Sequence, residues 1–202
     1  MLSLKIGGNQ PELCPEGTYV GRCIRVVDMG TQPSSYNGET RDRRLVSLTW
    51  EILDENTHKS DGDVFMLSRR FTLSLHEKSA LYNLISTWVG RLVDGADFPL
   101  TKLAGMYGLV VVTHTASGEK TFANISSVVP LPKGTPKPGP VHDTLVYSVS
   151  ESDDDVLAQL PEKMQEAIRT SPEYRTRSSG PPRLPPHAGG RYEVRADPDG
   201  RS

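Results

Sequence analysis

Apolar and polar residues alternate along three segments in the first half of the chain, and this period of two is typical of strands with one buried face. The segments are residues 18–28, 43–53 and 64–75. In the second segment, the residues predicted to face the core are Val46, Leu48, Trp50 and Ile52, and those predicted to face solvent are Arg43, Ser47, Thr49 and Glu51. In the third, Arg69 falls among the apolar positions, where a bulge or a strand end could re-aim it.

The period changes after residue 75. Between residues 76 and 91, apolar side chains recur at helical spacing, at Leu81, Leu84, Ile85, Trp88 and Val89. This pattern predicts a helix that begins after a capping pair, Ser74 and Glu77, and stops near Gly90. Two further strands are predicted at residues 108–114 and 120–129, joined by a hairpin turn at Ser117-Gly118.

The order of three strands, a helix and two strands indicates a mainly β domain. Five strands with a helix between the third and the fourth is the arrangement of an OB-fold, a small, partly open Greek-key barrel. Other small barrels and α+β sheets remain alternatives to this fold.

Proline marks the predicted end of the domain, because only four of the 16 prolines precede Val129. Residues 130–140 contain five of the others and are predicted to be an extended linker, since proline lacks an N–H and fixes φ. The sequence therefore predicts a folded domain over residues 12–131. The tail, residues 132–202, is predicted to be extended and largely disordered, apart from one short helix.

That short amphipathic helix is predicted at about residues 156–170, after an acidic run at residues 150–155. Its apolar residues, spaced four apart, are Leu160, Met164 and Ile168. Pro161 suits the first turn of such a helix, and Pro172 lies beyond its end. We expect these side chains either to dock on a partner, such as a replication or recombination enzyme, or to complete the core of the domain itself.

Charge and composition narrow the class of protein. The chain carries 23 Lys and Arg against 25 Asp and Glu, a formal net charge of −2, which excludes a uniformly basic binder but not a local patch. No apolar run approaches the roughly 18–20 residues that a membrane-spanning helix needs, and the N-terminus is too polar for a signal peptide. The two cysteines, Cys14 and Cys23, match no zinc or redox motif and are interpreted as reduced thiols in a cytoplasmic protein.

No motif in the sequence argues for catalysis. A phosphate-binding loop, a nucleophile elbow and an H-E-x-x-H zinc motif are all missing, and the five histidines have no ligand spacing. The segment Asp61-Gly62-Asp63 has too few acidic residues for a calcium loop and is interpreted as a turn between strands. We therefore expect no enzymatic activity, no cofactor and no metal.

Cationic and aromatic residues gather where an OB barrel binds its ligands, across strands 2 and 3 and the loops flanking them. Residues 29–42 are predicted to be the long first loop. Single-stranded nucleic acid suits this mixture, because cations follow the phosphates and rings stack on bases. The candidate nucleic-acid-binding residues are Tyr36, Arg41, Arg43, Arg44, Arg69, Arg70, Lys120 and Phe122.

A structural interpretation of the same residues is also open. Arginines on surface strands serve solubility, and Glu39, Asp42 and Glu51 could neutralise several of them. Phe122 could pack under the helix or the tail, and Tyr36 could fill its own loop. Trp50 and Trp88 are predicted to be core residues, because both fall on apolar faces.

Several segments resemble a known family. They are PEGTYVGRCIRVVDMGTQ, GETRDRRLVSLTWEILD, SRRFTLSLHEKSALYNLISTWVGR, KTFANISSVVPLPKG and LPEKMQEAIRTSPEY. Over about residues 15–175 the chain is similar to the OB-fold single-stranded DNA-binding proteins of phages and prophages. The resemblance implies sequence-independent binding of single-stranded DNA during phage replication or recombination, in the cytoplasm of the bacterial host. Four of the candidate residues lie in the matching segments: Arg43, Arg44, Arg69 and Arg70.

Two other functions are compatible with the same fold. An OB barrel can serve as a protein-interaction adaptor of a replication or recombination complex, with the tail helix as its contact. It can also be an accessory domain of a nuclease or polymerase. The C-terminus, residues 191–202, mixes basic and acidic side chains, unlike the acidic tip of many bacterial single-stranded DNA-binding proteins.

Overall fold

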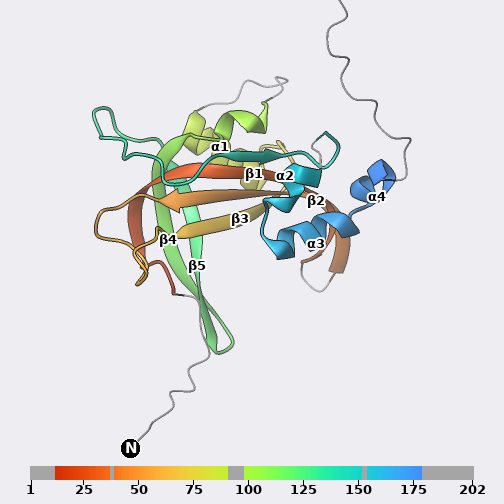
Figure 1. The fold of residues 1–202 in the computed structure, drawn as a ribbon, viewed down its shortest axis with the longest axis horizontal. Coiled ribbons are helices and arrows are strands. Elements are labelled where there is room, and N and C mark those ends of the chain that lie inside the picture. The colour runs from red at the N-terminus through yellow and green to blue at the C-terminus, as the bar shows by residue number, and fades with distance from the viewer. Residues whose placement is uncertain (1–11, 37–38, 91–97, 152–153, 179–202) are drawn as a thin grey trace, which may run out of the picture.

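A computed structural model describes residues 12–36, 39–90, 98–151 and 154–178 and shows a mainly β protein built on one six-stranded sheet (Figure 1). Hydrogen-bonded neighbours follow the order β3-β2-β1-β4-β5, all antiparallel, and a short β6 pairs with β1 in parallel. The strands are β1 (Gly17–Tyr36), β2 (Glu39–Ile52), β3 (Met66–Thr72), β4 (Tyr107–Ser117), β5 (Lys120–Val129) and β6 (Leu145–Tyr147).

The first two strands form one long hairpin instead of two short strands and a loop. β1 runs for 20 residues, and pairing with β2 continues as far as Tyr36 opposite Glu39. The prediction of a loop at residues 29–42 is therefore wrong. A bulge permits this length, because Gly30 takes a φ of +67° and its N–H bonds the Asp28 carboxylate, which re-aims the ribbon beyond it.

The inner face of the sheet holds the larger core, closed by helix α1 (Ala80–Val89) and a short 3-10 helix, η1 (Leu100–Leu103). Trp50 of β2 and Trp88 of α1 meet here with ring centroids 5.8 Å apart, so both are core residues as predicted. The helix starts later than predicted, because Ser79 is the N-cap and accepts a hydrogen bond from the Tyr82 N–H. It ends before Gly90, as the sequence indicates.

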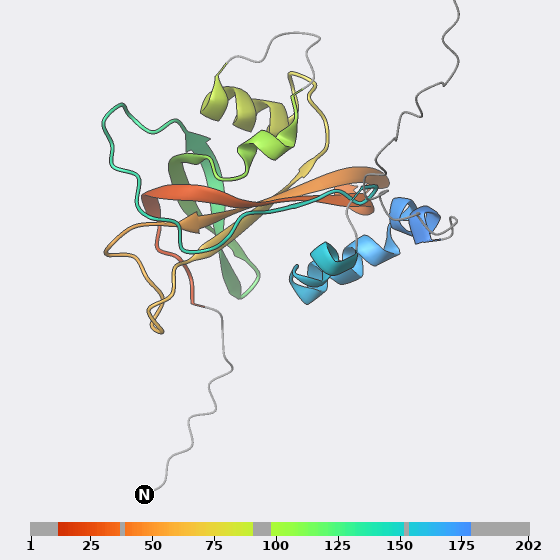
Figure 2. The same cartoon turned by 45° about the horizontal axis from the view of Figure 1, so that its top comes forward.

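The outer face of β2 is buried, although its polar residues were predicted to face solvent. Ser47, Thr49 and Glu51 are all at most 1% exposed. The reason is that residues after β5 return to this face: β6 pairs with β1 at residues 25–27, and three helices follow it. These are α2 (Asp154–Ala158), α3 (Glu162–Thr170) and α4 (Pro172–Ser178). Figure 2 shows α1 on one side of the sheet and α2, α3 and α4 on the other.

This second layer corrects the predicted division of the chain at residue 131. Val27 and Met29 of β1 share a buried cluster with Tyr147 and with apolar residues of α2 and α3. The proline-rich residues 130–140 contain no strand or helix, yet the Tyr107 hydroxyl donates to the Pro138 carbonyl at 2.8 Å. The folded unit thus extends at least to residue 178, and the remainder of the predicted tail, residues 179–202, lies outside the described structure.

A buried ion pair fixes the returning segment to the sheet. Glu51 of β2 is fully buried and accepts from Arg22 Nη1 at 2.8 Å. Its other oxygen accepts from the backbone N–H and from Nδ1 of His142, at 2.9 and 3.0 Å. Since the Arg22 guanidinium also donates to the His142 carbonyl, the three residues join β1, β2 and the segment that leads into β6.

The sheet is not closed into a barrel by strand pairing, because β3 and β5 are the two ends of its hydrogen-bonded path. A side chain crosses the gap instead. Arg69 of β3 donates from Nη1 to the carbonyls of Ile125 and Ser126 on β5, at 2.8 and 3.0 Å. The two edges are therefore held together by one guanidinium rather than by a ladder of backbone hydrogen bonds.

Candidate nucleic-acid interface

Besides the three-residue β6, three strands of the sheet carry no acidic residue. The sequences of β3, β4 and β5 are MLSRRFT, YGLVVVTHTAS and KTFANISSVV, and their cationic residues are Arg69, Arg70 and Lys120. In β1 and β2, by contrast, arginines alternate with Asp28, Asp42 and Glu51. Arg69, Arg70 and Lys120 therefore lie on strands that hold no acidic residue of their own, although the chain as a whole is slightly acidic.

Strand β5 presents its polar side chains outward. Ile125 and Val128 are buried in the inner core, whereas Lys120, Phe122 and Asn124 are exposed. Phe122 is 48% exposed and lies opposite Thr115, near the turn at Gly118 that joins β4 to β5. Figure 1 shows this hairpin projecting beyond the rest of the sheet. An exposed phenyl ring on a projecting hairpin is available to a ligand, and within the described residues it belongs to neither buried apolar cluster.

Strand β3 adds a cation to the same outer surface. Successive side chains of a strand point to opposite faces, so Arg70 points outward because Phe71 and Leu67 pack inward. Arg70 is exposed, and its neighbour Ser68 shares a hydroxyl hydrogen bond with Thr49 of β2 at 2.8 Å. We use the term β3–β5 face for the uncovered outer positions Ser68, Arg70, Lys120, Phe122 and Asn124.

Arg69 faces inward and does not belong to this surface. Besides its two bonds to β5, its guanidinium carbon lies 4.9 Å from the centre of the Phe71 ring. Desolvation by burial lowers its pKa. Its first role is therefore to hold β3 to β5, and the predicted pair Arg69 and Arg70 is divided between the two faces.

The arginines of β2 are divided in the same way. Arg44 donates to the Asp28 carboxylate at 2.6 Å, and this hydrogen bond raises the pKa of Arg44. Arg43 lies on the opposite side of the strand, half-buried and paired in register with Gln32, which bonds the Ala167 carbonyl of α3. Arg44 is therefore engaged by Asp28, whereas Arg43 falls on the same outer side of the sheet as Arg70, further along β2 from Ser47, the register partner of Arg70.

Two more predicted residues lie near the end of the long hairpin. Arg41 is exposed and pairs in register with Ser34. Tyr36 is the last residue of β1, and its side chain lies outside the part of the structure that is described. Neither is brought to the β3–β5 face by the pairing of the strands.

The residues predicted to bind a partner are in the interior. Leu160, Met164 and Ile168 are 3%, 8% and 0% exposed and pack against β1 and Tyr147. The predicted helix exists, divided into α2 and α3, and its apolar side completes the chain's own core. Docking of these side chains on another protein is therefore excluded while the helix remains in place.

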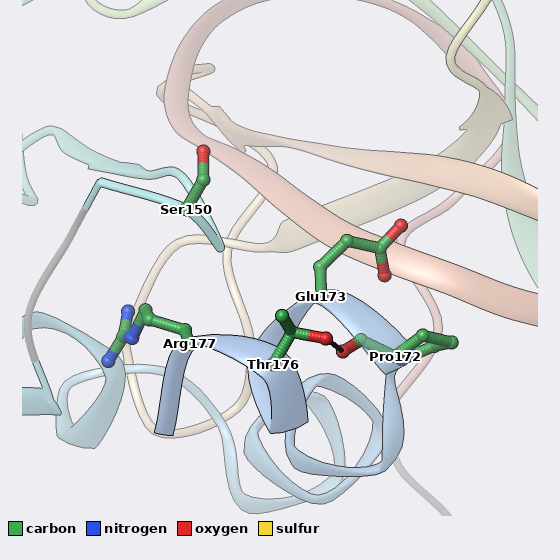
Figure 3. Close-up of a pocket in the computed structure, with 5 residues that line it drawn as sticks. All are labelled: Ser150, Pro172, Glu173, Thr176 and Arg177. Carbon is green, nitrogen blue, oxygen red and sulfur yellow. Dashed lines mark hydrogen bonds between the residues drawn. The ribbon is translucent and has the colours of Figure 1, made fainter. Parts of the chain in front are cut away.

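A cavity of about 450 Å³ lies between α4 and the turn before α2, lined by Ser150, Pro172, Glu173, Thr176 and Arg177 (Figure 3). Its charged groups are already engaged. Arg177 donates to Asp154 at 2.6 Å, and Glu173 accepts from the Thr31 hydroxyl and N–H at 2.6 and 2.9 Å. Burial opposes ionisation of Glu173, but the hydrogen bonds from Thr31 outweigh it and lower the pKa. The cavity offers no convergent set of unused polar groups.

Sequence reasoning missed Asn124, although its position could have been found. It lies two residues after Phe122 in an alternating strand, so the pattern that exposes the ring also exposes the amide. The turn predicted at Asp61-Gly62-Asp63 is present, with Gly62 at a φ of +85° and Lys59 bonded to Asp63. Within the described ranges, no three His, Cys, Asp or Glu side chains gather as metal ligands.

None of the helices in the described ranges has both the length and the apolar character that crossing a membrane requires. In comparisons with known proteins, no protein-family model and no curated protein matches this sequence, so no family membership is assigned to the chain.

Proposed function

We propose that this protein binds single-stranded DNA without sequence preference, through the β3–β5 face, in phage replication or recombination. The observation that carries the proposal is an exposed face with Arg70, Lys120 and Phe122 on strands that contain no acidic residue. The strand order, with β1 between β2 and β4, supports an OB-type barrel left open between β3 and β5. The resemblance to phage proteins supports a cytoplasmic role in a bacterial host.

The chemistry of the face favours a single strand over a duplex. Phe122 is almost half exposed, and a phenyl ring gains stacking energy only from a base that is not already stacked in a helix. Arg70 and Lys120 supply charges for the phosphates on either side, and the Asn124 amide offers hydrogen bonds that do not select one base. No set of side chains converges to recognise a particular base edge, so sequence preference is expected to be weak.

The small number of contacts between the β3–β5 face and DNA sets the expected affinity for DNA. The two cations of the β3–β5 face neutralise about two phosphates, so these two contacts alone should contribute about −1.4 to the slope of the logarithm of the binding constant against the logarithm of salt concentration. One stacked ring contributes roughly 1–3 kcal/mol. Binding should therefore be modest and sensitive to salt.

Fluorescence anisotropy with labelled dT30, compared with a duplex of equal length at low and moderate salt, tests the proposal. Phe122→Ala should weaken binding about 5- to 150-fold, which is the stacking energy expressed as a ratio. Arg70→Ala should weaken it and make the salt slope shallower by about 0.7. Arg169→Ala removes the same charge from the exposed side of α3 and serves as the matched control.

Three results would overturn the proposal. The first is an absence of dT30 binding at low salt, and the second is equal affinity for the duplex. In the first case the exposed face is better treated as a contact for another protein, as in an adaptor. The third, a loss of affinity in Arg169→Ala as large as in Arg70→Ala, would show binding by diffuse charge and would remove the β3–β5 face from the site.

A further inference from the structure

A small cavity lies where β3 and β5 approach each other over α1. Its volume is about 260 Å³. It is lined by Arg69, Ala80, Asn83, Leu84 and Ser126. These residues come from β3, from the first half of α1 and from β5, so the cavity occupies the unpaired seam of the sheet.

The guanidinium in this seam has a charge that no carboxylate balances. Within the described residues, Arg69 has no acidic partner, and Nη1 donates its hydrogen bonds to two neutral backbone carbonyls. The Nε and Nη2 groups of Arg69 have no hydrogen-bond acceptor among the residues that the structure describes. By contrast, the largely buried Arg22 bonds Glu51, and the exposed Arg44 bonds Asp28.

A partly buried charge without a counter-ion is unfavourable, because desolvation is not repaid by a nearby opposite charge. Desolvation of the guanidinium lowers the pKa of Arg69, which agrees with this account. The cavity lining adds the Asn83 amide and contains no acid, and the first turn of α1 has none either. An anion would relieve the imbalance.

We propose that the cavity binds a phosphate group of the nucleic-acid strand that the β3–β5 face holds. The unused Nε–H and Nη2–H of Arg69 form the parallel pair of donors that matches two phosphate oxygens. Arg69 and Arg70 are consecutive on an edge strand and point to opposite sides, so a strand that passes over this edge meets both. This inference rests on the proposed function, and it gives Arg69 a second role besides holding β5.

The test replaces Asn83 instead of Arg69, because removing Arg69 would also release β5. Asn83→Asp places a negative charge in the cavity lining, on an exposed position of α1 near its N-terminus, where an acidic residue suits the helix dipole. Lys163→Gln, on the exposed side of α3, changes the net charge by the same unit far along the chain and is the matched control. Circular dichroism and thermal melting establish that both variants fold.

For dT30 lacking a terminal phosphate, Asn83→Asp should bind on the order of tenfold more weakly than the wild type, with a salt slope shallower by about 0.7. Lys163→Gln should match the wild type. If the wild type binds dT30 and Asn83→Asp binds it equally well, the phosphate site is refuted while the proposed function stands. If the wild type does not bind dT30 at all, the proposed function fails first.

A second arm separates a strand phosphate from a free one. Inorganic phosphate is added to the wild type and to Asn83→Asp, and the melting temperature is followed. Stabilisation of the wild type alone, together with unchanged dT30 binding by the variant, would mean that the cavity takes a free anion, and the inference would be wrong. Loss of dT30 affinity in the variant supports the inference.

Discussion

Replacing Ile168 by alanine tests whether the C-terminal helices belong to the folded core. Ile168 on α3 is fully buried, and it lies in one apolar cluster with Val27 and Met29 of β1 and with Tyr147 of β6. Truncating a buried isoleucine to alanine removes its transfer free energy and leaves a cavity, which together cost about 2–5 kcal/mol. A domain of ordinary stability has only about 5–15 kcal/mol in total, so the effect should be large.

Urea and thermal unfolding, followed by circular dichroism, measure this loss. For a chain of this length, each kcal/mol lowers the melting temperature by about 2–4 °C, so Ile168→Ala should melt roughly 4–20 °C below the wild type. Glu166→Ala, on the exposed side of the same helix, is the control and should change the free energy of unfolding by no more than about 0.5 kcal/mol. Equal stabilities for the two variants would refute the packing described for α3.

The remaining predictions concern buried polar groups and thiols. Glu51→Gln should lower the free energy of unfolding in urea by about 1–3 kcal/mol, because Arg22 and His142 lose their carboxylate while keeping some access to water; an unchanged midpoint would contradict this. Burial raises the pKa of Cys14 to about 11 and that of Cys23 to about 12, so both thiols stay protonated at pH 8. They should react with a thiol reagent only on unfolding, and rapid labelling of the native protein would disprove their burial.

The five main strands could be predicted from the sequence because the residues on their inner face alternate with polar residues. Val46, Leu48 and Trp50 alternate with polar residues, and the inner core requires that alternation. The outer face of β2 could not be read in the same way. Ser47 and Thr49 are polar in type yet are buried by a segment that begins about 90 residues later, and local patterning contains no information about such a cover.

The residues of the candidate site were predicted from their chemical type alone. In the structure, the alternation of side chains along each strand decides which of them share a face. Adjacent arginines on a strand cannot share a face, so Arg43 and Arg44 separate, as do Arg69 and Arg70. Alternation could have given this division from the sequence. The partners could not be predicted, since Asp28 reaches Arg44 only through the pairing of β1 with β2.

The C-terminal layer also decides where a ligand can bind. The helices pack over Val27 and Met29 of β1, and His142, in the segment that leads into β6, covers Glu51 of β2, which removes that part of the outer face from solvent. The β3–β5 face, which includes Arg70 and Phe122, remains exposed to solvent. It lies on strands that lack acidic residues. In the proposed function, the cover on one half of the sheet and the lack of acidic residues in β3 and β5 direct a bound strand to the β3–β5 face. Since β5 rises about 3.3 Å per residue, the positions from Lys120 to Ser126 span about 20 Å. If this face holds single-stranded DNA as proposed, such a length accommodates only a few nucleotides, and the footprint of one protomer should fall at the lower end of the 4–16 nucleotides that an OB-fold covers.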